Sequence, residues 1–152
     1  MDISAIGTAL PPVTMTVDSG RLRLFAKATG DTNPVYTDVE AARAAGHPDL
    51  PVPLTFLFGI EMEVPEPFGW LNEINVDLSR VLHGEQSFVH HSTAHAGDTL
   101  VATPRITDIY HRKGGALTFI AKRTEITRDD GGAVADLENT VIVRNPGGGP
   151  NK

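Results

Sequence analysis

The stretch PVPLTFLFGIEM, residues 51–62, decides how this chain folds. It is apolar on almost every side, which is typical of a segment buried all round, and periodicity alone fits either a buried helix or a buried strand. The run from Leu54 to Met62 is long for a strand, and Pro53 stands at its head, where proline is compatible with a first helical turn. We therefore predict a buried central helix over residues 54–62.

The chain downstream of this helix has the pattern of strands. Apolar-rich runs separated by turn residues predict strands over 82–91, 100–110, 116–127 and 133–144, and a short upstream run predicts one over 13–17. The turns KGG at 113–115 and DDGG at 129–132 suit antiparallel hairpins. Apolar residues on both faces of the run 116–127 favour a sheet covered by a helix on one face and by a partner on the other.

Two further helices are predicted upstream of the central one. Asp18 can cap a helix that ends at Gly30. Thr37 and Glu40 form a capping box for a second, short helix over 38–45. A polar loop therefore connects the two helices.

These elements together predict an α+β fold, in which an antiparallel sheet wraps around a central helix. A chain of 152 residues is large enough for one domain with a substantial core. We expect that domain to span residues 1–144, followed by a flexible polar tail, NPGGGPNK, over 145–152.

Composition excludes several classes of site and partner. The chain has no Cys, which excludes disulfides, thiolate nucleophiles and Cys-based metal sites. Its 13 Lys and Arg against 19 Asp and Glu give a net charge of -6, which argues against nucleic acid or an anionic membrane as partner. No apolar run approaches the roughly 18 residues of a membrane helix, and the N-terminus lacks a signal-peptide pattern, so we expect a cytoplasmic protein.

The clustered histidines do not predict a metal site. Adjacent strand residues such as His90 and His91 point to opposite faces, and a turn separates them from His95. No Asp or Glu completes a recognisable ligand spacing around them. We expect surface or interface residues there, and neither a metal nor a cofactor.

Three passages resemble one known family. GDTNPV, residues 30–35, is similar to the hydratase-2 motif of the MaoC-like dehydratases, which are (R)-specific enoyl-thioester hydratases with a hot dog fold. PVPLTF, residues 51–56, resembles the start of the central helix in the N-terminal-type branch of that family. LHGEQSF at 82–88, with AGDTL at 96–100, resembles that branch's first long strand and the turn after it. The resemblance implies a single hot dog domain that dimerises as a double hot dog.

The resemblance also implies a reaction. The family adds water reversibly to trans-2-enoyl thioesters of CoA or acyl carrier protein, giving (R)-3-hydroxyacyl thioesters, and this chemistry requires a base, an acid and a donor to the thioester oxygen. In the family an Asp and a His across the motif handle the water and the proton. Asp31 stands at the Asp position, but Tyr36 replaces the His. A phenol is a hydrogen-bond donor rather than a ready base at neutral pH, so the usual pair is broken.

The groups that bind the substrate depend less on side chains. The first free N–H groups of a helix can face the thioester oxygen, and because Pro53 has none, the backbones of Leu54 and Thr55 are the candidates. Asn33 belongs to the same substrate-binding loop, where its side chain is expected to close the turn that aims Asp31. Binding groups are therefore present although the proton-transfer pair is incomplete.

Several functions fit these residues. The chain is either a hydratase that uses Asp31 with a substitute for the missing His, or the accessory half of a double hot dog, paired as a homodimer or as a heterodimer with a catalytic hot dog subunit. A hot dog acyl-CoA thioesterase with Asp31 or Glu61 as the base is the alternative from another enzyme class, although the GDxNP segment speaks against it. In a non-catalytic acyl-binding module, Asp31 is only a turn residue. The broken pair favours the accessory role or an altered activity.

Overall fold

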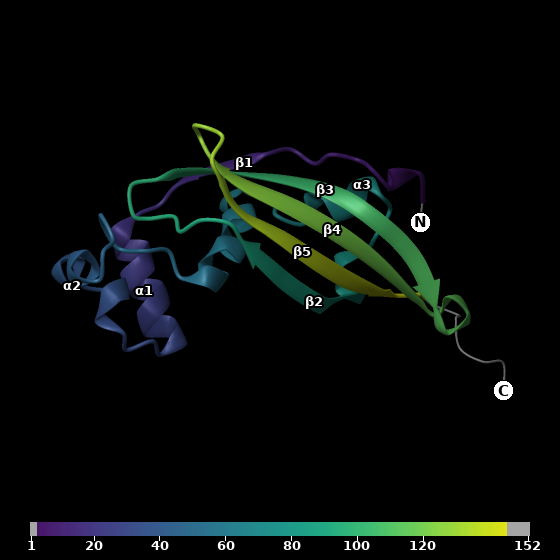
Figure 1. The fold of residues 1–152 in the computed structure, drawn as a ribbon. Coiled ribbons are helices and arrows are strands. Elements are labelled where there is room, and N and C mark those ends of the chain that lie inside the picture. The colour runs from purple at the N-terminus through teal and green to yellow at the C-terminus, as the bar shows by residue number, and fades with distance from the viewer. Residues whose placement is uncertain (1–2, 146–152) are drawn as a thin grey trace.

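The computed structural model describes residues 3–145, which form one five-stranded antiparallel sheet with short helices around it (Figure 1). The strands are β1 (Val13–Thr16), β2 (Val81–His90), β3 (Thr99–Arg112), β4 (Leu117–Arg128) and β5 (Ala133–Arg144). Their order across the sheet is β1-β3-β4-β5-β2. The predicted α+β fold is confirmed, and the predicted strands differ from the observed ones only at their ends.

Helices connect and flank the strands. The α-helices are α1 (Ser19–Thr29), α2 (Val39–Ala44) and α3 (Gly69–Glu73). The 3-10 helices are η1 (Ile3–Ala5), η2 (Pro34–Tyr36), η3 (Leu54–Glu63), η4 (Leu78–Arg80) and η5 (Lys113–Gly115). α1 and α2 lie together beyond one end of the sheet (Figure 1).

η3 is the central helix around which the sheet curves, as in a hot dog fold. Its side chains Phe56, Leu57 and Ile60 are buried in one cluster with apolar residues of β1, β3, β4 and β5. The predicted buried helix is therefore confirmed, in 3-10 form. A 3-10 run of 10 residues is unusual because its hydrogen bonds are poorly aligned, so packing against the sheet must hold η3 in place.

A second buried cluster joins α3 and the segment after it to the sheet. Leu71 of α3, together with Ile74 and Val76, packs with Ile106 of β3 and Ile120 of β4. No pattern in the sequence predicted α3, which has only 5 residues and follows a proline-rich stretch. Tertiary packing determines this segment more than local preference does.

The two predicted helix starts have different outcomes. α1 begins as predicted, with the Asp18 side chain accepting a hydrogen bond from the first turn. The capping box predicted for α2 is wrong, because Asp38 and not Thr37 caps the helix, its Oδ1 accepting from Glu40 N–H at 2.8 Å. Asp caps a helix at least as well as Thr, and the Thr37 N–H already closes the η2 turn.

The C-terminal part of the fold can be followed to Asn145. Its N–H donates to Ala116 O at 2.9 Å, and its Nδ2 donates to Thr118 Oγ1 at 2.8 Å. Of the tail predicted over 145–152, residues 146–152 lie outside the described part of the chain. Within residues 3–145, no helix is both long and apolar enough to cross a membrane.

Candidate active site

Four of the five predicted site residues line one cavity of about 350 Å³. Asp31 and Tyr36 line it from the loop after α1, whereas Leu54 and Thr55 line it from the start of η3. Asn33 is not among the lining residues. The other residues around the cavity are Phe25, Ala26, Thr29, Gly30 and Pro53. Two passages that are far apart in the sequence therefore line the same space.

The end of α1 fixes the backbone of Asp31. Gly30 has a φ of 73°, in the left-handed region that favours glycine, and it ends the helix. Its N–H donates to Lys27 O at 3.3 Å, and the Asp31 N–H donates back to Ala26 O at 2.9 Å. This pair of bonds is a Schellman motif, so the helix itself determines where Asp31 begins.

Two consecutive Asx turns shape the loop that carries the motif. Asp31 Oδ1 accepts from the Asn33 N–H at 2.9 Å, and Asn33 Oδ1 accepts from the Val35 N–H at 3.1 Å. Asn33 thereby caps η2, whose last residue is the half-buried Tyr36. Asn33 shapes the loop, while the exposed Asp31 carboxylate keeps Oδ2 outside this turn.

The start of η3, which also lines the cavity, has backbone N–H groups outside the helical hydrogen bonds. The Phe56 N–H makes the first η3 turn by donating to Pro53 O at 3.0 Å, so the N–H groups of Leu54 and Thr55 precede the helical hydrogen bonds. Leu54 is 59% exposed. The carbonyl of Leu54 lies 3.2 Å from His90 Nε2, at the end of β2. His90 therefore contacts the start of η3, which its place in a strand did not reveal.

An ion pair ties α1 to the other end of η3. The Arg21 guanidinium donates two hydrogen bonds to the Glu63 carboxylate, at 2.6 and 2.8 Å, and also lies 6.0 Å from the centre of the Phe56 ring. This hydrogen bonding lowers the pKa of Glu63 and raises that of Arg21. Phe25 packs edge-on against Phe56 at 5.4 Å between ring centres. These contacts hold α1, and with it the Asp31 loop, against η3.

Glu61 lies outside the cavity that Asp31 lines. Its carboxylate forms an ion pair with Lys122 and accepts a hydrogen bond from Thr124 Oγ1 at 2.6 Å. The Lys122 ammonium also lies 5.4 Å from the centre of the Trp70 ring. These bonds occupy both oxygens of Glu61, so the structure counts against Glu61 as the base of a thioesterase.

No group of three or more His, Asp or Glu side chains within residues 3–145 is arranged to hold a metal ion. Two contacts of histidine side chains do occur, each with a single partner residue. His91 Nε2 lies 3.0 Å from Asp136 Oδ2, and His47 Nδ1 lies 3.1 Å from His95 Nε2.

Comparison with known families shows the family of this chain. The family model of the FAS1-like dehydratase domain region matches residues 4–137. The chain belongs to this family. The FAS1-like dehydratase-region chain is 38% identical over 146 residues to a UPF0336 protein of Saccharopolyspora erythraea, covering 95% of this chain and 92% of that protein. It is 37% identical over 146 residues to a UPF0336 protein of Streptomyces coelicolor, covering 95% of each.

Solved structures have the same fold. A chain of the C-terminally truncated HadBC complex of Mycobacterium tuberculosis, a (3R)-hydroxyacyl-ACP dehydratase, superimposes with a TM-score of 0.80 at 28% identity, covering 93% of this chain and 98% of that one. A chain of the ChsH1-ChsH2 complex of the same organism has a TM-score of 0.76 at 22% identity, with 96% and 93% covered. A MaoC-like dehydratase has a TM-score of 0.82 at 24% identity, with 94% and 43% covered. The predicted MaoC-like family and hot dog fold are confirmed.

Proposed function

We propose that this FAS1-like dehydratase-region chain is the accessory half of a double hot dog that hydrates trans-2-enoyl thioesters or dehydrates (R)-3-hydroxyacyl thioesters. The observation that carries the proposal is the cavity shared by Asp31, Tyr36 and the start of η3. That cavity has the groups to hold a thioester of CoA or acyl carrier protein. A second hot dog subunit would supply the complete Asp and His pair.

Binding in the cavity follows from its two walls. A thioester oxygen that faces Leu54 and Thr55 would accept from their free N–H groups, which point out of the start of a ten-residue helix. The acyl carbons would then lie toward Asp31 and Tyr36, which line the same cavity from the loop after α1. A cavity of about 350 Å³ is in the lower range of small-molecule sites, which suits the reacting part of an acyl thioester.

The wall of the cavity that carries Asp31 and Tyr36 lacks one of the two proton-transferring groups, a base and an acid, that the reaction needs. Asp31 can accept a proton from water, but the proton that the α-carbon gains or loses needs a second group that exchanges protons near neutral pH. Tyr36 stands where the family has its His, and a phenol can donate a hydrogen bond to the substrate without exchanging its proton readily. The wall is therefore equipped for binding and poorly equipped for turnover.

The open edge of the sheet gives a place for the second subunit. β2 pairs with β5 on one side only, and no strand of the described residues 3–145 lies beyond it (Figure 1). Leu82 and Val89 of β2 are 44% and 58% exposed, and Leu54 and Phe58 of η3 are exposed as well. A long unpaired edge with exposed apolar residues favours strand pairing with a partner. By analogy, the HadBC and ChsH1-ChsH2 complexes, each named for two subunits, support this pairing.

Crotonyl-CoA tests the proposal with three separate readings on the wild-type chain. Isothermal titration reports binding, absorbance of the conjugated double bond reports hydration, and a thiol reagent reports release of CoA. We expect binding without appreciable hydration or release. Rapid hydration would make the chain a hydratase by itself, rapid release of CoA would make it a thioesterase, and absence of binding would contradict an acyl-thioester role.

A further inference from the structure

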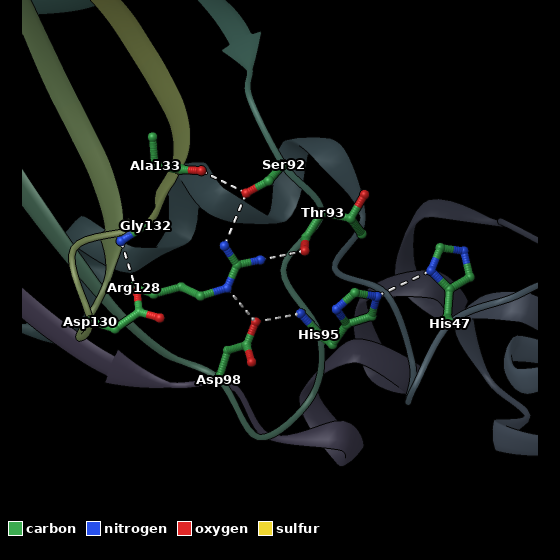
Figure 2. A network of polar contacts seen from close by, with 9 residues as sticks. All are labelled: His47, Ser92, Thr93, His95, Asp98, Arg128, Asp130, Gly132 and Ala133. Atoms are coloured by element: carbon green, nitrogen blue, oxygen red, sulfur yellow. Dashed lines mark hydrogen bonds and ion pairs between the residues drawn. The ribbon is translucent and has the colours of Figure 1, made fainter.

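Two histidines that the proposed site does not use contact each other outside the cavity. His47 Nδ1 and His95 Nε2 are 3.1 Å apart, with ring centres 5.3 Å apart (Figure 2). Both side chains are half-buried. His47 follows α2, whereas His95 belongs to the turn before β3, so the contact joins segments from the two halves of the chain.

The position of His47 is fixed from α2. Gly46 has a φ of 93°, its N–H donates to Arg43 O at 3.0 Å, and the His47 N–H donates to Ala42 O at 3.0 Å. α2 therefore ends in the same Schellman motif that places Asp31 after α1. Because only two residues separate α2 from η2, whose last residue is Tyr36, His47 is tied to the Tyr36 wall of the cavity.

The position of His95 is fixed by a frame around Arg128. The Arg128 guanidinium donates from Nε to Asp98 Oδ2 at 3.2 Å, from Nη1 to Ser92 Oγ at 3.0 Å and from Nη2 to Thr93 O at 2.6 Å (Figure 2). Asp98 Oδ2 also accepts from the His95 N–H at 3.0 Å. Both ends of the His95 turn are therefore anchored to β4.

The same turn holds the segment that leads into η3. The Val52 N–H donates to Ala94 O at 2.8 Å, and the Ala96 N–H donates to Leu50 O at 2.9 Å, on either side of a bridge between Pro51 and His95. The η3 donors follow directly after this paired segment. His95 is thus tied to one wall of the cavity, as His47 is tied to the other.

We propose that the hydrogen bond between His47 and His95 is a positioning link, which sets the start of η3 relative to the Tyr36 wall and fails in acid. The effect on thioester binding rests on the proposed function; the effect on the start of η3 does not. Two imidazoles share a hydrogen bond only when one nitrogen donates and the other accepts. Once both rings are protonated, two donors with like charge face each other, and the link is lost.

The surroundings of His95 determine where on the pH scale this happens. Burial lowers the pKa of His95, and the charges of His47 and Arg128 lower it further, against the opposing effect of Asp98 and Asp49. The ordinary value for histidine is about 6.5. The link is therefore intact at neutral pH, and it is lost as the pH falls through the lowered pKa of His95, which lies below that ordinary value.

Amide side chains provide the conservative variants. An Asn amide occupies the place of Nδ1 and a Gln amide that of Nε2, so His47→Asn combined with His95→Gln retains a hydrogen bond that does not titrate. His47→Ala removes the link. His111→Asn is the matched control, since His111 contacts Thr118 Oγ1 through Nδ1 at 2.9 Å and takes no part in this network.

The first measurement is the dissociation constant for crotonyl-CoA at about pH 7.5 and about pH 5.5. We expect acid to weaken binding to the wild type about five-fold, as for the loss of one hydrogen bond. His47→Ala should show that loss already at the higher pH, and the His111→Asn control should behave like the wild type. The Asn and Gln double variant should bind like the wild type at the higher pH and be less sensitive to acid. Equal acid sensitivity in the double variant would overturn the proposal.

The second measurement needs no ligand. The ¹H–¹⁵N signals of Leu54 and Thr55 should shift on His47→Ala at constant pH. On acidification they should shift more in the wild type than in the double variant, where only His90, which contacts the Leu54 carbonyl in both proteins, still responds. Signals that stay fixed in the wild type would overturn the link even if thioester binds. A wild type that binds no crotonyl-CoA but shows these shifts would contradict the proposed function and leave the positioning link supported.

Discussion

The two ends of η3 differ in how their polar groups are satisfied. At its start, the N–H groups of Leu54 and Thr55 precede the helical hydrogen bonds and border an open cavity. At its end, Glu61 and Glu63 each have an ion-pair partner on another element. Charges that are paired contribute to holding the fold, whereas unpaired donors beside a cavity are available to a ligand. The comparison assigns stability to one end of the helix and binding to the other.

The largest expected effect on stability comes from breaking the buried ion pair between Glu61 and Lys122, at the C-terminal end of η3. In Lys122→Ala the Glu61 carboxylate, with its side chain only 16% exposed, loses its cation, and we expect the free energy of unfolding to fall by about 3 kcal/mol. Urea denaturation measures this loss. Replacing both partners, as Glu61→Met with Lys122→Met, should recover much of it because no charge is left unpaired.

Binding provides the contrast for that variant. Lys122→Ala should bind crotonyl-CoA like the wild type at temperatures where it stays folded, because Lys122 lies outside the Asp31 cavity. A folded Lys122→Ala protein with strongly weakened thioester binding would contradict the division between the two ends.

A smaller effect is expected from the exposed pair between Arg21 and Glu63. Arg21→Ala should lower the free energy of unfolding by about 0.5–1 kcal/mol, since the side chains are 46% and 29% exposed and water screens the pair. The matched control is Arg43→Ala, whose pair with Glu40 lies within α2 and is more exposed, and we expect about 0.3 kcal/mol there. Urea denaturation of both variants compares the two pairs.

The contribution of Glu63 also depends on pH. Arg21 lowers the pKa of Glu63, so this stabilisation is present above the ordinary glutamate value of about 4.3 and is lost as the pH falls through the lowered folded value. The difference in the free energy of unfolding between the wild type and Arg21→Ala should therefore shrink below about pH 4. A difference that grows in acid would show that the sign of the coupling is wrong.

Some features of this fold follow from the sequence and others do not. Asp18 and Gly30 predict both ends of α1, because capping is local chemistry between neighbouring residues. The strands follow from alternation and from glycine turns. The start of α2 was misassigned because Thr37 and Asp38 are both good caps, and only the turn before them decides between the two.

The site divides in the same way. The resemblance of the motifs predicted the candidate site residues, and the structure shows that Asp31, Tyr36 and the start of η3 share a cavity. The ion pair between Arg21 and Glu63 and the contact between His47 and His95 join residues more than 40 positions apart. No spacing rule within a helix or strand reaches across such a separation.

The smallest effect on stability is expected at the open end, from Asp31→Asn. Asn keeps the acceptor of the Asx turn, so the free energy of unfolding should change by less than about 0.5 kcal/mol in urea denaturation. Asp130→Asn, an Asx-turn carboxylate in the hairpin between β4 and β5, is the matched control. A loss of several kcal/mol specific to Asp31→Asn would mean that the carboxylate holds the fold and is not reserved for a ligand.

The most direct test of the accessory role is the hydration of crotonyl-CoA by Tyr36→His, measured as loss of the conjugated double bond. Restoring an imidazole on the wall that carries Asp31 should raise the rate by about 10²-fold over the wild type, as a positioned acid–base group does. Tyr36→Phe should stay at the wild-type rate, and adding Asp31→Asn to Tyr36→His should abolish the gain. A folded Tyr36→His protein that binds the thioester and gains no rate would contradict the account.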